Sequence, residues 1–440
     1  MNYWAVPTVV ATTFALSLTA CRGDDIEFDC TYQAERFAAA VEKEGVLLPE
    51  VTDIDTYPLA MMISEDGINR LLGGVVGDEI PFASEMQLGP TKVKFTPTAT
   101  PVIDVVSIPT CNQCVLFSIE FKFGVVQGNP EEGITAGLGD AYLAIPIRLD
   151  QRPDGTAALV ALYNEAEVTK MDLIANGLDS ENHEAISGAL ALLATDIVRE
   201  QYGETELLVI GSLEIGNHDV EARARDLFVI PDLDAILLGM ETNLELPEGA
   251  GLDQPKGLPE GTPMGIIFDP QMILAVSQRM IVEGEIARRY GEDGVPAEDG
   301  IYGVTLDSMT PGTVADDRLD TRFRIWRTDE GYCGFATAEM PMILAINAST
   351  GLEVNPGNVS VIGGEGSGRL AADREELIQK NAGLIDGFKA ALAEQVGLTL
   401  NYRSIGVEGS SIFFEPLDIN VDVATNSVNF YLDFVVAVDE

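Results

Sequence analysis

One helical pattern occurs twice in this chain of 440 residues, and a shift of 205 positions superimposes the two copies. In the first copy Ser64 can cap a helix; in the second Asp269 can cap it and Pro270 suits its first turn. The apolar positions recur at helical spacing in both copies. The matched residues are Ile68, Leu71, Val75 and Val76 with Ile273, Val276, Met280 and Ile281.

A second pair of helical patterns follows in the same order. The first stripe is Ile186, Leu190, Leu193 and Ile197, and the second is Leu384, Ile385, Phe388 and Leu392. A shift of 195 aligns Leu190 with Ile385 and carries the dipeptide Ile210-Gly211 onto Ile405-Gly406. Two matches in the same order predict a duplicated architecture with two similar halves.

Between the helical patterns the apolar residues alternate with a period of two. Phe117, Ile119, Phe121 and Phe123 alternate with Ser118, Glu120 and Lys122. Near the end, two alternating runs flank a turn at Thr425-Asn426. Their apolar residues are Leu417, Ile419, Val421 and Val423, then Val428, Phe430, Leu432 and Phe434, with Asn420, Asp422, Asn429 and Asp433 on the other face. This alternation is typical of antiparallel sheets with one face in water, so each half is predicted to be α+β.

The segment 247–263 is rich in Pro and Gly and is predicted to link the halves. The predicted domains are therefore 50–246 and 264–440. Before them come a signal peptide at 1–20 and, at 21–49, a lipidated cysteine with its tether.

The start of the chain carries an export signal. The apolar run 9–18 is too short for a stable membrane anchor, and it ends in Leu18-Thr19-Ala20-Cys21. This tetrad resembles the processing box of bacterial lipoproteins, which implies acylation of Cys21, although residues 1–7 lack the usual Lys or Arg. The alternative is an ordinary cleaved signal peptide. By resemblance to enterobacterial sorting, Arg22 after the cysteine favours the outer membrane, facing either the periplasm or the surface.

Export places the other four cysteines in an oxidising compartment, where three full pairings are possible. Cys111 and Cys114 form a C-x-x-C motif that precedes a strand pattern, whereas a redox dithiol needs a helix N-terminus. A structural turn disulfide is therefore favoured. Cys30 would then pair with Cys333.

The charge excludes one class of function. The chain has 26 Lys and Arg against 71 Asp and Glu, a net charge of −45. A nucleic-acid-binding protein needs a cationic face, so no nucleic-acid partner is expected. The acidic surplus favours solubility.

The duplicated architecture resembles the tubular lipid-binding superfamily, to which the bactericidal/permeability-increasing protein belongs. The resemblance is carried by Ile63-Ser64-Glu65-Asp66-Gly67-Ile68-Asn69-Arg70-Leu71-Leu72, by the stretch from Phe268-Asp269-Pro270 to Ile281, and by the order of elements. It implies two tandem repeats, each a curved antiparallel sheet wrapped on long amphipathic helices. It also implies a phospholipid or another acyl lipid as ligand. The basic endotoxin-binding tip of that family has no counterpart in so acidic a chain.

A sheet rolled around a helix either packs solid or encloses an apolar site, and the same residues serve both arrangements. The candidate ligand-binding residues are Ile68, Leu72, Val76, Phe117, Ile119, Phe121, Phe123, Met272, Ile273, Met280 and Ile281.

Catalytic patterns are weak. The two histidines, His183 and His218, lie in a polar helix start and a turn, and no G-x-S-x-G occurs. The acidic loops at 292–300 and 316–320 do not follow the calcium-loop pattern. No enzyme activity, metal or cofactor is expected.

The predicted function is binding or transport of acyl ligands by an outer-membrane lipoprotein. The alternative is a structural or partner-binding lipoprotein with a filled core, whose protein partner is unknown.

Overall fold

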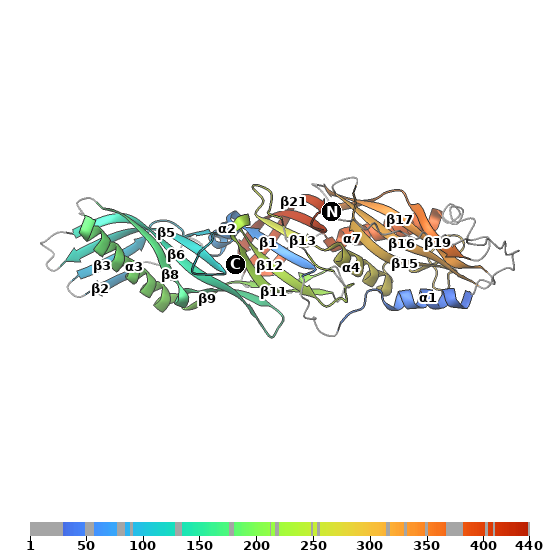
Figure 1. The fold of residues 1–440 in the computed structure, drawn as a ribbon, viewed down its shortest axis with the longest axis horizontal. Helices are drawn as coiled ribbons and strands as arrows, with labels where there is room; N and C mark the ends of the chain where they lie inside the picture. The colour runs from blue at the N-terminus through green and yellow to red at the C-terminus, as the bar shows by residue number, and fades with distance from the viewer. Residues whose placement is uncertain are drawn as a thin grey trace, which may run out of the picture.

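The computed structural model is elongated, with curled strands at each end and the central strands of one long sheet between them (Figure 1). The structure describes residues 30–48, 57–76, 84–88, 91–127, 134–175, 180–211, 213–215, 220–247, 250–252, 256–313, 317–329, 332–347, 351–366, 382–400, 404–407 and 410–438. Residues 59–242 are called the N-terminal half below, and residues 264–438 the C-terminal half.

A helix precedes the first half: α1 (Cys30–Glu42). The N-terminal half then begins with β1 (Leu59–Ser64) and α2 (Glu65–Val76). A meander follows, with β2 (Ser84–Leu88), β3 (Thr91–Pro97), β4 (Val102–Asp104), β5 (Cys114–Gln127), β6 (Ile134–Gln151), β7 (Ala157–Leu162) and β8 (Glu167–Ala175). The half closes with α3 (Ser180–Tyr202), β9 (Glu204–Ile210), β10 (Leu213–Glu214), β11 (Glu221–Ile230) and β12 (Ala235–Thr242).

The C-terminal half repeats this order. It begins with β13 (Met264–Phe268) and α4 (Pro270–Glu283). Its meander is β14 (Arg289–Tyr290), β15 (Tyr302–Pro311), β16 (Arg318–Asp329), β17 (Tyr332–Asn347), β18 (Gly351–Pro356) and β19 (Ser360–Gly366). It closes with α7 (Ala382–Leu400), β20 (Ser404–Val407), β21 (Ser410–Asp422) and β22 (Ser427–Val438). The predicted two-repeat α+β arrangement is confirmed.

The duplicated strands pair with each other. β1 and β13 are antiparallel, with Leu59 opposite Phe268 and Ile63 opposite Met264. The other matched strands, β9 and β20, meet at the Ile210–Val407 bridge. One sheet therefore runs through both halves in the order β10-β11-β12-β1-β13-β22-β21-β20-β9-β7-β6-β5-β3-β2. The second sheet, β14-β15-β16-β17-β18 with β19 on β17, curls over the C-terminal half alone.

The helices are less uniform than the resemblance implies. α3 and α7 span 23 and 19 residues, but α2 and α4 span only 12 and 14. The two short helices follow the central strands directly. Ser64 accepts a hydrogen bond from the Gly67 amide at 3.1 Å, and Asp269 accepts one from the Gln271 amide at 2.7 Å, as expected for helix caps.

The predicted linker packs on the central sheet. Leu252 and Leu258 cover a small apolar cluster formed by Met62, Leu237 and Ile267. Gly265 leaves space for Leu258, since a Cβ there would lie 2.6 Å from Cδ2 of that leucine. The central strands are therefore buried on both faces.

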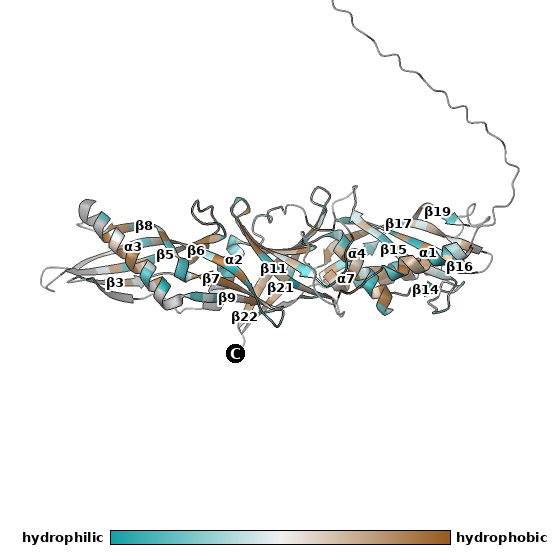
Figure 2. Ribbon diagram, turned by 60° about the horizontal axis from the view of Figure 1, so that its bottom comes forward, coloured by the Kyte–Doolittle hydropathy of each residue, from teal (hydrophilic) through white to brown (hydrophobic). Residues whose placement is uncertain are grey.

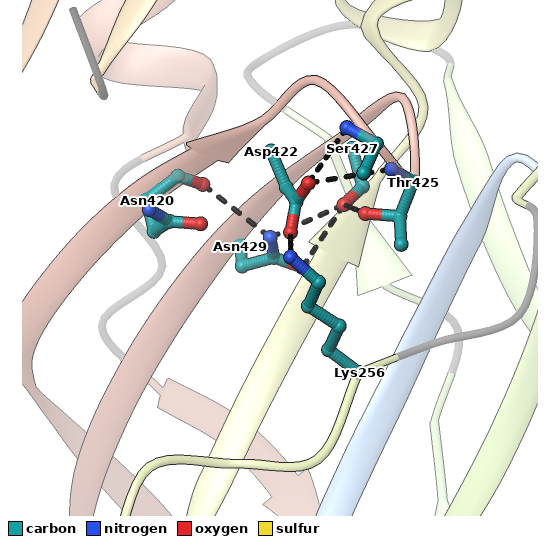
Figure 3. A network of polar contacts seen from close by, with 7 residues as sticks. Lys256, Asn420, Asp422, Thr425, Ser427 and Asn429 are labelled. Carbon is teal, nitrogen blue, oxygen red and sulfur yellow. Dashed lines mark hydrogen bonds and ion pairs between the residues drawn. The ribbon is translucent and has the colours of Figure 1, made fainter.

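The linker also contacts the last hairpin, β21 and β22, whose buried residues differ from those that the alternation predicts. Lys256 forms an ion pair with Asp422, and Asn429 bonds to Ser427 at 3.1 Å (Figure 3). Asp422 and Asn429 are consequently buried, although the alternation placed them in water. On the predicted apolar face, Leu417 and Val423 are exposed instead. A bulge between Pro416 and Asp418 accounts for Leu417, because it shifts the register there.

Both predicted disulfides are present. Cys111 pairs with Cys114, and Cys30 pairs with Cys333 across 303 residues of sequence. The second bond fixes the start of α1 to β17. Helix α1 lies within residues 21–49, which were predicted to be a tether without a helix. Gln33, Phe37 and Val41, four residues apart, are the signal that could have indicated one.

Candidate functional site

The interior of the N-terminal half is built on β5 and β6. Phe117, Ile119, Phe121 and Phe123 of β5 are all buried, and Glu120 and Lys122 between them are exposed, as the alternation predicts. The register sets Phe117 opposite Leu143 and Ile119 opposite Ala141. One face of this antiparallel pair is therefore wholly apolar.

Two glycines of β6 leave room for two of these rings. Phe121 is opposite Gly139 and Phe123 is opposite Gly137. A Cβ at Gly139 would lie 2.7 Å from the Phe121 ring, and one at Gly137 would lie 2.8 Å from the Phe123 ring. The Phe95 ring stacks on Phe121 at a centroid distance of 4.3 Å. This end of the interior is therefore closely packed.

Helix α3 closes the same interior. Leu190, Leu193 and Val198 are buried, and Leu192 faces outward with 69% of its surface exposed. The helix carries both hydrophobic and hydrophilic residues along its length (Figure 2). Arg199 donates to the Ala166 carbonyl at 3.0 Å, which holds the helix to the segment before β8.

The motif that carries the family resemblance docks α2 on β4. Asn69 donates to the Ile103 carbonyl at 2.8 Å and accepts from the Ile103 amide at 2.7 Å. Glu65 accepts from the Val105 amide at 2.8 Å. Arg70 reaches the other half, where it pairs with Asp433 at 2.7 Å. These polar residues position Ile68, which is buried.

The predicted residues of the C-terminal half lie on α4. Met272, Ile273, Met280 and Ile281 are buried to 98% or more. They face the curled sheet through β15, where Gln278 donates to the Leu306 carbonyl at 2.9 Å. Residues 272–277 of this helix are all buried, and its surface becomes exposed only near its end, where Val282 is 46% exposed.

Sequence reasoning missed most of the interior of the C-terminal half. Six of the twelve methionines are almost fully buried there, and of these only Met272 and Met280 were predicted; the others are Met264, Met309, Met340 and Met342. Phe323 of β16 contacts Phe388 of α7 at a centroid distance of 5.2 Å. Alternation in 319–325 and 336–344 is the signal that could have found these strands.

All predicted ligand residues whose side chains the structure describes belong to one apolar cluster. It contains Ile68, Phe117, Ile119, Phe121 and Phe123 of one half with Met272, Ile273, Met280 and Ile281 of the other. The side chains of Leu72 and Val76 lie outside the described set. The cluster is continuous through the central strands, which contribute Leu59, Met61 and Phe268.

The titratable groups near this interior are held neutral or paired. Burial raises the pKa of Tyr290 to about 12, so the phenol stays protonated at neutral pH. Burial also raises the pKa of Glu44, against the opposing effect of Arg288, with which it pairs.

Among the residues that the structure describes, no cluster of His, Cys, Asp and Glu could hold a metal. The described acidic loop 292–300 is organised by internal hydrogen bonds, such as the one from the Val295 amide to Asp293 at 3.1 Å. The His183 side chain and His218 lie outside the described set, as does Cys21. None of the described helices is long and apolar enough to cross a membrane.

Comparison with known proteins gives matches among solved structures, two of which are described here. Neither a scan of protein-family models nor a search of curated protein sequences finds a match. The structure of a lipopolysaccharide binding protein matches 86% of this chain and 99% of its own, at 10% identity and a TM-score of 0.39. P47 of Clostridium botulinum E1 matches with the same coverage, 9% identity and a TM-score of 0.45. The α+β arrangement described above therefore rests on the topology of this chain itself.

Proposed function

We propose that the protein binds and transports lipid or another acyl ligand in its apolar interior. In this proposal it is a lipoprotein, acylated at Cys21 and held at the bacterial outer membrane. We infer the class of ligand from the continuous apolar cluster, which runs from β5 through the central strands to α4 and β17. Such a lining suits a hydrocarbon chain and requires no polar group to read a head group.

The energetics favour an acyl ligand. Each CH₂ group transferred from water to an apolar interior contributes about 0.8 kcal/mol. A stretch of twelve carbons would therefore contribute roughly 10 kcal/mol before the entropic costs of association. The six buried methionines of the C-terminal half suit this role, because Met is flexible and adapts to ligands of different shape.

A second candidate is a structural or partner-binding lipoprotein whose core is filled. The observation that favours it is the close fit of Phe121 and Phe123 over Gly139 and Gly137. Rings seated so closely on the neighbouring strand favour a packed core at that end of the N-terminal half. In the lipid-binding proposal we place the ligand toward the central strands and the methionine-rich C-terminal half.

The two candidate functions predict different amounts of lipid bound to the purified protein. Residues 22–440 would be purified without detergent, and native mass spectrometry and solvent extraction would measure bound acyl lipid. We expect stoichiometric lipid, released on denaturation. A mass without lipid that persists after incubation with liposomes would contradict the lipid proposal and favour the filled core.

A pair of variants on α4 locates the ligand. Met280→Trp adds volume inside the cluster and is expected to lower lipid occupancy several-fold. Val282→Trp adds the same ring on the exposed face of the same helix and should leave occupancy unchanged. Equal occupancy in both variants, with both folded by circular dichroism, would place the ligand elsewhere.

A further inference from the structure

Helix α1 lies against the outer face of the curled sheet of the C-terminal half. Its first residue, Cys30, is bonded to Cys333 of β17, with a Cα–Cα distance of 5.4 Å. Phe37 is 94% buried and lies over Gly303 of β15, where a Cβ would lie 2.5 Å from the ring. The helix is therefore seated in a position that the sheet leaves open for it.

Aromatic rings and cations reinforce this contact. Phe37 packs against Trp326 at a centroid distance of 5.7 Å, and Trp326 packs against Phe335 at 4.7 Å. The Arg36 guanidinium lies 5.0 Å from the centre of the Phe335 ring and pairs with Glu365 of β19 at 2.5 Å. The start of α1 is thus held by covalent, aromatic and ionic contacts together.

The segment after α1 is held at its other end by the central sheet. Glu44 is buried, pairs with Arg288 and accepts from the Leu306 amide at 2.8 Å. Leu47 forms a β-bridge with Leu244, next to β12. Residues 30–47 therefore extend along the C-terminal half, from its outer end to the central sheet, and Figures 1 and 2 both show α1 along that half.

The segment that joins Cys21 to Cys30 is short. Eight residues lie between the two cysteines, which are therefore nine positions apart. Even fully extended, nine residues span at most about 30 Å. An acyl group on Cys21 must consequently lie within that distance of Cys30, near β19 and the start of β17.

We infer that the outer end of the C-terminal half faces the membrane that holds the acylated Cys21, and that the N-terminal half projects away from it. The inference rests on the proposed acylation. The curled sheet β2-β3-β5-β6 and helix α3 lie at the opposite end of the molecule from α1 and β19 (Figure 1). The Cys30–Cys333 bond sets this orientation, because it moves the first fixed point of the chain to the outer end. Without α1 docking, the first fixed point would be Glu44, 23 positions from Cys21, which is held by Arg288 and by Leu306 of β15.

The orientation is tested by energy transfer in liposomes. The full-length acylated protein would be reconstituted into phosphatidylethanolamine–phosphatidylglycerol vesicles that carry an acceptor dye on a fraction of the head groups. A fluorescent amino acid replaces Ile362 of β19 or, separately, Ile174 of β8. Both residues are exposed, at 48% and 71%. Ile362 lies next to Gly363, which is paired with Thr337, about 13 Å along β17 from Cys333.

We expect transfer from position 362 to be several-fold more efficient than from position 174. In the matched variant Cys30→Ser with Cys333→Ser and Phe37→Ala, the difference should shrink, because α1 no longer holds the tether at the outer end. Equal transfer from both positions of the acylated native protein, or stronger transfer from 174, would overturn the orientation alone. An intact mass without acyl chains would overturn both the orientation and the proposed anchoring. Lipid extraction from the interior is a separate measurement, so the two proposals fail independently.

Discussion

At the scale of single residues, the interior of the N-terminal half depends on complementary volumes. Large rings on β5 face the smallest residues on β6, in the pairs Phe121–Gly139 and Phe123–Gly137. Alternation in the sequence predicts which residues of β5 point inward. It does not predict that β6 provides glycines at the matching positions, because the register between the strands is a tertiary property.

Gly139→Ala is expected to destabilise the protein by roughly 1–3 kcal/mol, the usual cost of overpacking a core. Its Cβ would lie 2.7 Å from Phe121 and 2.9 Å from the Asp172 carbonyl oxygen, which cannot easily move. The control is Gly124→Ala on β5, where no atom lies within 4 Å of the added Cβ. Urea denaturation followed by fluorescence measures both variants. An unchanged midpoint for Gly139→Ala would mean that the rings are not seated as described.

A second residue-scale prediction concerns Asp422 in the last hairpin (Figure 3). Burial alone would raise its pKa, but hydrogen bonds from Lys256 and from the Ala424 and Thr425 amides outweigh burial and lower it. A carboxyl group with a lowered pKa stabilises the fold above its unfolded pKa of about 3.8, and this stabilisation is lost as the pH falls through the folded value.

Asp422→Asn should therefore cost roughly 1–3 kcal/mol at pH 7, as expected for hydrogen bonds to a charged group. The difference from the native protein should shrink below about pH 4, where Asp422 becomes neutral as well. Thermal melting at a series of pH values would show this convergence. A constant difference across the series would exclude a role for the charge.

At the scale of elements, local sequence predicts the stripes of α2, α3, α4 and α7 and the strands β5, β21 and β22, but it misses α1 and the strands β15 to β19. The stripes of α3, α4 and α7 contain several apolar residues each, so the sequence alone indicates them. In α1 only Gln33 and Phe37 are fully buried, and the surrounding residues are polar or alanine. Its stability as an element comes from Cys333, Trp326 and Phe335 on strands that lie 284 or more residues later in the chain.

Phe37→Ala is expected to release α1 from the sheet, because a buried aromatic side chain contributes about 3–5 kcal/mol to packing. Hydrogen exchange of residues 30–42 should rise by orders of magnitude, while exchange in β5 and β6 stays unchanged. Tyr32→Ala is the matched variant, since Tyr32 is an aromatic of the same helix with 54% of its surface exposed. Slow exchange in α1 after Phe37→Ala would show that the disulfide alone holds the helix.

At the scale of the whole molecule, the two repeats share one sheet. The duplicated strands β1 and β13 pair over their full length, and β22 and β12 lie on either side of that pair. Arg70 of α2 and the α1 segment add contacts from the first part of the chain to the second. The apolar cluster crosses the same strands. The repeats are therefore similar units without independent cores.

A fragment of residues 258–440 is accordingly expected to aggregate when expressed alone, because β13 would present an unpaired edge and an uncovered apolar face. Coexpression with residues 22–257 should restore a soluble complex. Size-exclusion chromatography and circular dichroism would distinguish these outcomes. A monomeric fragment 258–440 with a cooperative melting transition would instead show that the halves fold independently.

The sequence by itself determined the duplication, the α+β class and the inward residues of β5 and α4, and it favoured the disulfide pairing that the structure shows. The fold class and the inward residues follow from periodic spacing and from cap residues such as Asp269, which are local signals. The disulfide pairing was favoured because four cysteines allow few alternatives. Only the tertiary structure decided that β1 pairs with β13, that the linker buries Asp422 and Asn429, and that α1 covers the C-terminal sheet. Each of these depends on residues far apart in the chain meeting in one register, and a spacing pattern contains no such information.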